Sequence, residues 1–221
     1  MKTLFITGGA GFIGVNSADH FAQRGWRIVV IDNLSSPGAE DNIRWLQQAH
    51  DGVRFERADV RDAATMERLV GEVQPEALLH LAAQVAVTTS VADPRLDFEV
   101  NALGTFNLLE AVRRRSPQSS FIHASTNKVY GKMDDLEVMQ RDGGGPANAL
   151  SLLALVAMLE ERLGKCIPLQ FADWRPGDQP VFVCNVGKAR ELLEWAPEIG
   201  ARDGVSRLIE WVGQNRGLFA Q

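Results

Sequence analysis

Cysteine is scarce in this sequence, and its scarcity narrows the kinds of fold that are possible. Only two of the 221 residues are cysteines, Cys166 and Cys184, and neither has a second cysteine or a histidine nearby at metal-ligand spacing. The sequence therefore predicts neither a disulfide framework nor a bound metal. We interpret both cysteines as small buried apolar residues of a protein that folds in a reducing compartment.

Long apolar runs and basic clusters are scarce as well. No stretch approaches the roughly 18 uninterrupted apolar residues of a membrane-spanning helix, and the apolar start runs into glycines without a signal-peptide cleavage site. The net charge is −5, and the one basic run, Arg113–Arg115, is interpreted as the solvated end of a helix. We therefore predict a cytoplasmic protein that binds neither membranes nor nucleic acid.

What the chain does contain is the composition of a globular protein, with 45% hydrophobic and 23% charged residues. Up to about residue 130, short apolar runs alternate with stretches of helical period, which predicts βαβ units around a parallel sheet. The expected strands are Thr3–Thr7, Arg27–Asp32, Val53–Arg57, Ala77–Leu81 and Ser120–Ala124. The expected helices between them are 12–24, 39–49, 62–73 and 96–115.

The alternation of apolar runs and helical stretches ends after residue 130. We predict a first domain over 1–131, a linker or the site of a missing segment over 132–149, and a small C-terminal part over 150–221. Helices are expected in that last part over 151–163, with Ser151 as N-cap, and over 187–194 and 203–214. The fold class is α/β, a Rossmann-type doubly wound parallel sheet followed by an incomplete C-terminal substrate-binding part.

The first expected strand runs directly into a glycine-rich turn, Gly8–Gly14, which has the spacing G-x-G-x-x-G. Glycines at this spacing permit a tight turn, the approach of backbone N–H groups to a pyrophosphate, and close packing of the following helix. Asp32 ends the second strand 24 residues after Gly8, where a carboxylate can accept both ribose hydroxyls. We predict dinucleotide contacts at Gly8, Gly11, Phe12, Ile13, Gly14 and Asp32.

The same acid indicates which dinucleotide is bound. A carboxylate at Asp32 would repel the 2′-phosphate of NADP, and the next residue is Asn33 rather than an arginine, so we predict NAD. Asp59 and Val60, just past the third strand, are expected near the adenine, although a charged turn is an alternative for Asp59. His80 and His123 lie at strand positions and are interpreted as packed core residues.

Four segments together are similar to one known family. They are ITGGAGFIG at residues 6–14, HLAAQ at 80–84, NALGT at 101–105 and STNKVYG at 125–131. The chain resembles an extended short-chain dehydrogenase/reductase of the NAD-dependent epimerase/dehydratase family. The runs at 84–90, 178–183, 195–197 and 203–205 further resemble the CDP-tyvelose (CDP-paratose) 2-epimerase branch.

The resemblance implies a function and a set of site residues. A nucleotide sugar, CDP-linked in that branch, would lose a hydride to bound NAD, pass through a keto sugar and regain the hydride on the opposite face. Thr126 would be catalytic by holding the sugar hydroxyl. The resemblance places Leu81, Ala82, Ala83, Gln84, Asn101, Asn33, Asp59 and Val60 at the cofactor, and Gln84, Thr126, Asn127, Arg175 and Asp178 at the substrate. It also implies a homodimer formed through helices that include 96–115.

Arg175 and Asn127 carry alternatives. Arg175 would hold the diphosphate, because a guanidinium offers paired donors to phosphate oxygens, or it pairs within its turn with Asp173 or Asp178. Dehydratases of the family carry Asp-Glu after the threonine as acid and base, whereas this chain has Asn127 and Lys128. A 4,6-dehydratase is therefore the weaker alternative.

The sequence departs from the family at its catalytic base. The family uses a Tyr-x-x-x-Lys pair, but the single tyrosine here, Tyr130, is followed four residues later by Asp134. A tyrosine with the ordinary pKa of about 10 is ionised in about one molecule per thousand at pH 7, so it is a poor base. Either a segment bearing the pair lies outside this sequence, or it is deleted. The deletion would leave a non-catalytic protein that binds NAD or a nucleotide sugar.

Overall fold

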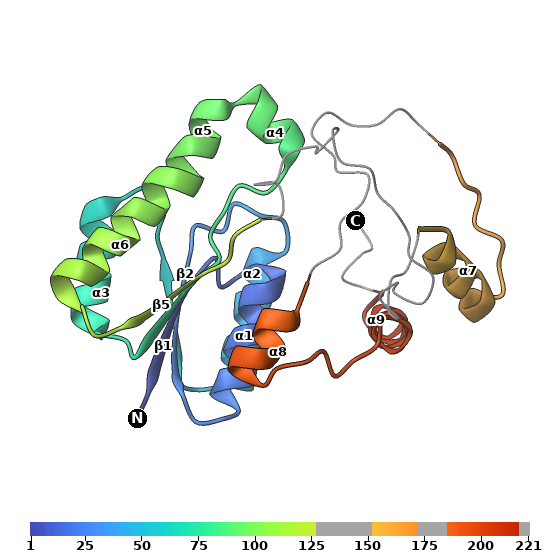
Figure 1. Cartoon of the computed structure of the whole chain (residues 1–221), viewed down its shortest axis with the longest axis horizontal. Coiled ribbons are helices and arrows are strands. Elements are labelled where there is room, and N and C mark those ends of the chain that lie inside the picture. The colour runs from blue at the N-terminus through green and yellow to red at the C-terminus, as the bar shows by residue number, and fades with distance from the viewer. Residues whose placement is uncertain (127–151, 172–184, 217–221) are drawn as a thin grey trace. The chain divides into compact units, whose positions relative to one another are not determined.

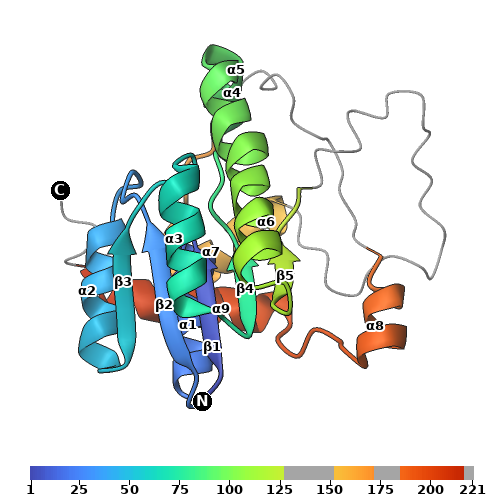
Figure 2. The ribbon, with the colours of Figure 1, turned by 90° about the vertical axis from the view of Figure 1, so that its left-hand side faces the viewer.

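The computed structural model describes residues 1–126, 152–171 and 185–216, and the chain divides into two units, Met1–Thr126 and Asn127–Gln221. A parallel sheet forms the centre of the first unit, with strand order β3-β2-β1-β4-β5 (Figures 1 and 2). Its strands are β1 (Thr3–Thr7), β2 (Arg27–Asp32), β3 (Val53–Arg57), β4 (Ala77–His80) and β5 (Ser120–His123). The predicted α/β fold is confirmed, and β4 and β5 each end one residue earlier than expected.

The register of the sheet brings the ends of distant strands together. Thr7, the last residue of β1, pairs with Ile31 of β2 on one side and with His80 of β4 on the other. His80 in turn pairs with His123 of β5. Because the strands are parallel, the loops that follow them all leave the sheet at this one edge.

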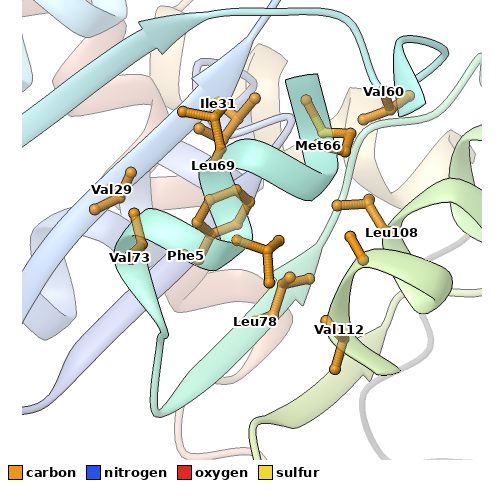
Figure 3. Close-up of a cluster of buried hydrophobic side chains, with 12 residues drawn as sticks. Phe5, Val29, Ile31, Val60, Met66, Leu69, Val73, Leu78, Leu108 and Val112 are labelled. Carbon is orange, nitrogen blue, oxygen red and sulfur yellow. The ribbon is translucent and has the colours of Figure 1, made fainter. Parts of the chain in front are cut away.

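Helices cover both faces of the sheet. Side chains alternate along a strand, so Leu4 and Ile6 of β1 point to the face covered by α1 (Phe12–Ala22) and α2 (Ala39–Ala49). Phe5 between them points to the face covered by α3 (Ala63–Val73) and α6 (Gly104–Arg115). Figure 3 shows this second core, where Phe5 packs among side chains of α3, α6 and the neighbouring strands. These two cores fix the sheet that carries the loops.

The long helix predicted over 96–115 is interrupted, which corrects the prediction. The structure has α5 (Pro94–Phe98), a π-helical turn η1 (Glu99–Leu103) and then α6. A π turn accommodates one residue more than an α-helical turn and re-aims the side chains around it. A short helix that the sequence did not predict, α4 (Val87–Ala92), precedes α5. Its Thr-Thr-Ser segment has low helix propensity, which explains why the pattern did not indicate it.

The second unit contributes three helices to the described residues, namely α7 (Leu152–Leu163), α8 (Gly187–Leu193) and α9 (Ala201–Gln214). They match the helices predicted over 151–163, 187–194 and 203–214 to within about two residues. The predicted N-cap Ser151 and Cys184 lie outside the described residues. Within the residues that the structure describes, no helix has both the length and the apolar character needed to cross a membrane.

Two side chains predicted to be buried are exposed. Cys166 lies on the surface just after α7, where hydrogen bonding to Glu160 raises the pKa of its thiol. His123 is exposed because β5 is the edge strand of the described sheet, and Ile122 beside it is also 54% exposed. His80, in contrast, is 1% exposed, so the core interpretation is confirmed for that histidine alone.

Candidate functional site

The glycine-rich turn is held in a geometry that only glycine can adopt at two positions. Gly8 has a left-handed backbone, with φ of +68°, and a Cβ there would lie 2.6 Å from the backbone nitrogen of Ala82. A Cβ on Gly14 would lie 2.4 Å from the carbonyl oxygen of Gly8. Helix α1 therefore begins in direct backbone contact with the turn that precedes it.

The first turn of α1 faces the edge of the sheet with unpaired N–H groups. Helices leave their first N–H groups without intrahelical partners, and in α1 these belong to Phe12, Ile13 and Gly14. Gly11, the N-cap, has no side chain that could accept from them. The side chains of Phe12 and Ile13 are exposed. This arrangement supplies backbone donors and the positive end of a helix dipole, which suit a phosphate.

Asp32 lies beside the turn at the end of β2, and backbone amides fix its carboxylate. Ala10 N–H donates to Oδ2 at 3.1 Å, and Leu34 N–H donates to Oδ1 at 2.8 Å. A carboxylate oxygen has two lone pairs, so each oxygen keeps one for a ligand hydroxyl. The turn is held from a second side by Asn42 of α2, whose Nδ2 donates to the Ala10 carbonyl at 2.8 Å. The structure thus brings together the predicted glycines and the predicted acid.

Asp59 lies in the next loop and already has protein partners. Arg61 donates to it from its backbone N–H, Nε and Nη2 at 2.8 to 3.0 Å, and Asn33 donates from Nδ2 at 3.0 Å. These hydrogen bonds, those from the Arg61 side chain above all, lower the pKa of the Asp59 carboxyl well below its usual range. Asp59 thus forms the hydrogen bonds expected of a charged residue in a turn, which is the alternative to a position near the adenine. It stays ionised at neutral pH.

Val60 is buried, and α6 fixes the backbone around it. Asn107 donates from Nδ2 to the carbonyl oxygens of Val60 and Arg61, at 3.0 and 3.1 Å. Gly104 permits the close approach, because a Cβ there would lie 2.6 Å from the Val60 side chain. No sequence motif singles out Asn107, because its partners lie 46 and 47 residues away along the chain.

The loop after β4 is held by Asn101 of η1. Leu81 N–H donates to the Thr7 carbonyl at 2.9 Å, which continues the sheet by one bond. Asn101 then accepts from the Gln84 N–H at 2.9 Å and donates to the Gln84 carbonyl at 3.0 Å. Asn101 also donates to Asp97 at 3.0 Å. In this structure Asn101 therefore holds, by these hydrogen bonds, the backbone of the loop that contains Ala82 and Ala83.

Of the residues assigned to the sugar, the structure places two. Gln84 lies in the loop described above, and Thr126 follows β5 in an exposed position on the edge where the other strand-end loops lie. Asn127, Arg175 and Asp178 lie outside the described residues. The sequence reasoning missed Thr7, Asn42, Arg61 and Asn107, which hold the predicted residues in place without belonging to any motif.

Comparison with known proteins identifies the family. The family model for GDP-mannose 4,6 dehydratase matches residues 5–149. The chain is 45% identical over 131 residues to the CDP-paratose 2-epimerase of Salmonella typhi, covering 59% of this chain and 38% of that protein. It is 37% identical over 143 residues to a dTDP-glucose 4,6-dehydratase of Xanthomonas campestris, covering 61% of this chain and 40% of that protein.

Solved structures agree with the sequence matches. The UDP-glucose 4-epimerase of Thermus thermophilus in complex with NAD has 40% identity and a TM-score of 0.53, covering 62% of this chain and 42% of that one. The UDP-Glc/GlcNAc 4-epimerase of Campylobacter jejuni has 30% identity and a TM-score of 0.56, covering 60% and 39%. The chain thus spans about two-fifths of the length of the curated relatives that it matches. It belongs to the GDP-mannose 4,6 dehydratase family of extended short-chain dehydrogenases/reductases.

Proposed function

We propose that this chain binds NAD at the turn Gly8–Gly14 and is the cofactor-binding portion of a nucleotide-sugar epimerase. The observation that carries the proposal is the junction of the glycine turn, the unpaired amides of α1 and the fixed carboxylate of Asp32 at one edge of the sheet. The amides of Phe12 and Ile13 would hold the pyrophosphate, and Asp32 would hold the ribose. Bound NAD supplies the acceptor and donor of hydride in such epimerases.

The choice of NAD over NADP follows from charge at Asp32. Both carboxylate oxygens are held by backbone amides, so the negative charge cannot swing away from an incoming 2′-phosphate. One arginine of this region, Arg61, is engaged with Asp59 and lies 3.7 Å from Glu99, so its charge is already balanced by two acids. Arg57 of β3 is in register with Asp32 and is exposed. The fixed negative charge of Asp32 therefore favours a free 2′-hydroxyl over a phosphate.

Replacing Asp32 is expected to weaken NAD binding by about ten- to hundredfold, because hydrogen bonds to a charged group contribute about 1.5–3 kcal/mol. Asp32→Asn keeps the shape, loses the charge and is expected to raise the affinity for NADP relative to NAD. Asp51→Ala, in the turn before β3 at the opposite edge of the sheet, is the control and should bind both cofactors as the wild type does. Calorimetric titration with each cofactor measures the ratio. An unchanged NAD-to-NADP ratio in Asp32→Asn would contradict the assignment.

For the substrate we propose a nucleotide sugar, CDP-linked as in the Salmonella typhi relative. Thr126 would orient the sugar hydroxyl, and Gln84, Asn127, Arg175 and Asp178 would contact the substrate. Asn127 and Lys128 stand where a dehydratase needs an acid and a base, so epimerisation is favoured over loss of water. A cytoplasmic location fits such a substrate.

An epimerase would need a catalytic base from a segment outside these 221 residues, because Tyr130 lacks the lysine four residues later. The second candidate function, a non-catalytic NAD or nucleotide-sugar binding protein, is favoured by this same observation. Electrospray mass of the purified protein distinguishes them. A mass above 24.3 kDa would indicate an additional segment and support the epimerase. A mass of 24.3 kDa would support the binding protein.

Activity is then tested with CDP-paratose and no added cofactor. The epimerase is expected to interconvert CDP-paratose and CDP-tyvelose, because its NAD would be regenerated in each turnover. A 4-keto-6-deoxy product from another nucleotide sugar would identify a dehydratase instead. NAD binding without conversion of any nucleotide sugar would leave the binding protein.

We also propose a homodimer formed through α5 and α6. Phe98 and Phe106 on these helices are 63% and 58% exposed, and Leu109 on α6 is 46% exposed. Phe106→Asp is expected to convert the dimer to a monomer, measured by light scattering during gel filtration. Trp45→Asp on α2 changes a residue that is 50% exposed on the other face of the sheet and should leave the dimer intact. A monomeric wild type would refute this assembly.

A further inference from the structure

A buried histidine bridges two of the loops of the dinucleotide site. His80 ends β4 with 1% of its surface exposed, and both of its ring nitrogens have partners. Nδ1 lies 2.6 Å from Oγ1 of Thr7, and Nε2 lies 2.9 Å from Oγ1 of Thr105. These partners are 73 and 25 residues away along the chain. None of the roles assigned above uses this ring.

The hydrogen bonds define which ring nitrogen carries the proton. The Thr105 hydroxyl donates its one hydrogen to the Asn101 carbonyl at 2.6 Å, so its oxygen can only accept from His80. Nε2 therefore carries the hydrogen, and Nδ1 accepts from the Thr7 hydroxyl. Burial, with a smaller contribution from His123, lowers the pKa of His80 to about 4, so the ring is neutral at pH 7.

Each end of this chain of hydrogen bonds leads to a loop of the site. Thr7 directly precedes Gly8, and its carbonyl accepts from the Leu81 N–H at 2.9 Å. Thr105 is bonded to the carbonyl of Asn101, whose side chain holds both backbone groups of Gln84. The two loops touch, because a Cβ on Gly8 would lie 2.6 Å from Ala82. A shift of η1 relative to β1 would therefore change the spacing between them.

We infer that His80 is a positioning residue of the dinucleotide site, and that its Nε2–H form, bonded to Thr7 and Thr105, sets the distance between the glycine turn and the loop 81–86. The inference rests on the proposed binding of NAD. Thr105, a residue outside every predicted site, then affects the affinity for the cofactor through the backbone of η1.

The test uses Thr105, because its hydroxyl can be removed and restored with little change in volume. Thr105→Val removes the acceptor of the His80 proton and is expected to weaken NAD binding by about tenfold, as for the loss of one buried hydrogen bond. Thr105→Ser restores the hydroxyl and should return the affinity to within about twofold of the wild type. Leu69→Ala, in the core on α3, destabilises the unit without touching this network. It should bind NAD normally at temperatures where it is folded.

Two readouts separate this inference from the proposed function. In ¹⁵N-histidine NMR spectra of the full chain, which has four histidines, His80 should show a protonated Nε2 and an unprotonated Nδ1. The histidine signals that are missing from the spectrum of the His80→Gln variant are assigned to His80. The opposite protonation pattern, or equal NAD affinity in Thr105→Val and wild type, would overturn the inference and leave the proposed NAD site standing.

If the wild type does not bind NAD, the proposed function fails and hydrogen exchange decides the positioning role. The Gln84 amide, which donates to Asn101, should then exchange faster in Thr105→Val than in the wild type and in Thr105→Ser. Unchanged exchange of that amide in Thr105→Val would overturn the inference by itself.

Discussion

Replacing Gly14 by alanine is expected to weaken NAD binding by more than about a hundredfold, which corresponds to about 3 kcal/mol. The new Cβ would lie 2.4 Å from the Gly8 carbonyl oxygen and 2.5 Å from the Gly9 Cα. Both obstacles are backbone atoms, so no side-chain rotation can relieve the overlap. Helix α1 would have to move away from the turn, and the amides of Phe12 and Ile13 would move with it. Calorimetric titration with NAD measures the loss.

Two further glycines make the experiment specific. At Gly11 the backbone φ is −73°, and a Cβ would meet only the Gly8 carbonyl oxygen, at 3.3 Å. Gly11→Ala requires a shift of only a few tenths of an ångström, so it should cost much less thermal stability than Gly14→Ala. It should still lose about tenfold in NAD affinity, because the methyl group would intrude where the pyrophosphate is held. Gly52→Ala meets nothing within 4 Å and should change neither quantity. Wild-type affinity in Gly14→Ala would show that NAD does not bind at this turn.

The sheet and the glycine turn could be predicted because their signals are local. The strand Arg27–Asp32 contains the continuous apolar run 28–31 and ends at an acid, and the turn Gly8–Gly14 follows its own strand directly. Both patterns reflect backbone geometry over a few residues, so a single sequence contains them. The acid at the strand end was predicted as a ligand contact, and the structure adds that the Ala10 and Leu34 amides hold it in place.

The interruption of the helix predicted over 96–115 could not be found in this way. Apolar periodicity continues across η1, because Leu96, Val100 and Leu103 have the i, i+4, i+7 spacing of a helix face. What fixes the π turn is tertiary, since Asn101 is held by the loop at Gln84. Such contacts depend on residues that the sequence separates and only the folded sheet brings together.

The errors at His123 and Cys166 have the same origin. The strand position of His123 and the small apolar side chain of Cys166 indicate that each residue can be buried, but burial also requires an element that covers it. His123 is on the edge strand of the described sheet, and Cys166 follows the end of α7 at Gly164, where φ is +61°. Nothing in the sequence around these two residues distinguishes them from buried ones. Only the arrangement of the neighbouring elements could correct the prediction.

Acid is expected to destabilise the first unit through His80. The pKa of His80 is about 4 in the folded protein and about 6.5 in the unfolded chain, so the unfolded chain binds more protons between these values. The contribution of His80 to the free energy of unfolding is therefore complete above pH 6.5 and is lost as the pH falls towards 4. The difference of 2.5 pKa units corresponds to about 3 kcal/mol at pH 4.

His80→Gln separates this contribution from the titration of other groups, because glutamine carries no proton at any of these pH values. The wild type should exceed His80→Gln in free energy of unfolding by about 3 kcal/mol more at pH 7 than at pH 4, measured by urea denaturation at each pH. The ionised Asp59 keeps its charge in the folded state throughout this range and is common to both proteins. A constant difference from pH 7 to pH 4 would show that the His80 ring gains its proton in the folded protein as readily as in the unfolded chain. In that case burial, with the smaller contribution of His123, would not be holding the ring neutral below its ordinary pKa.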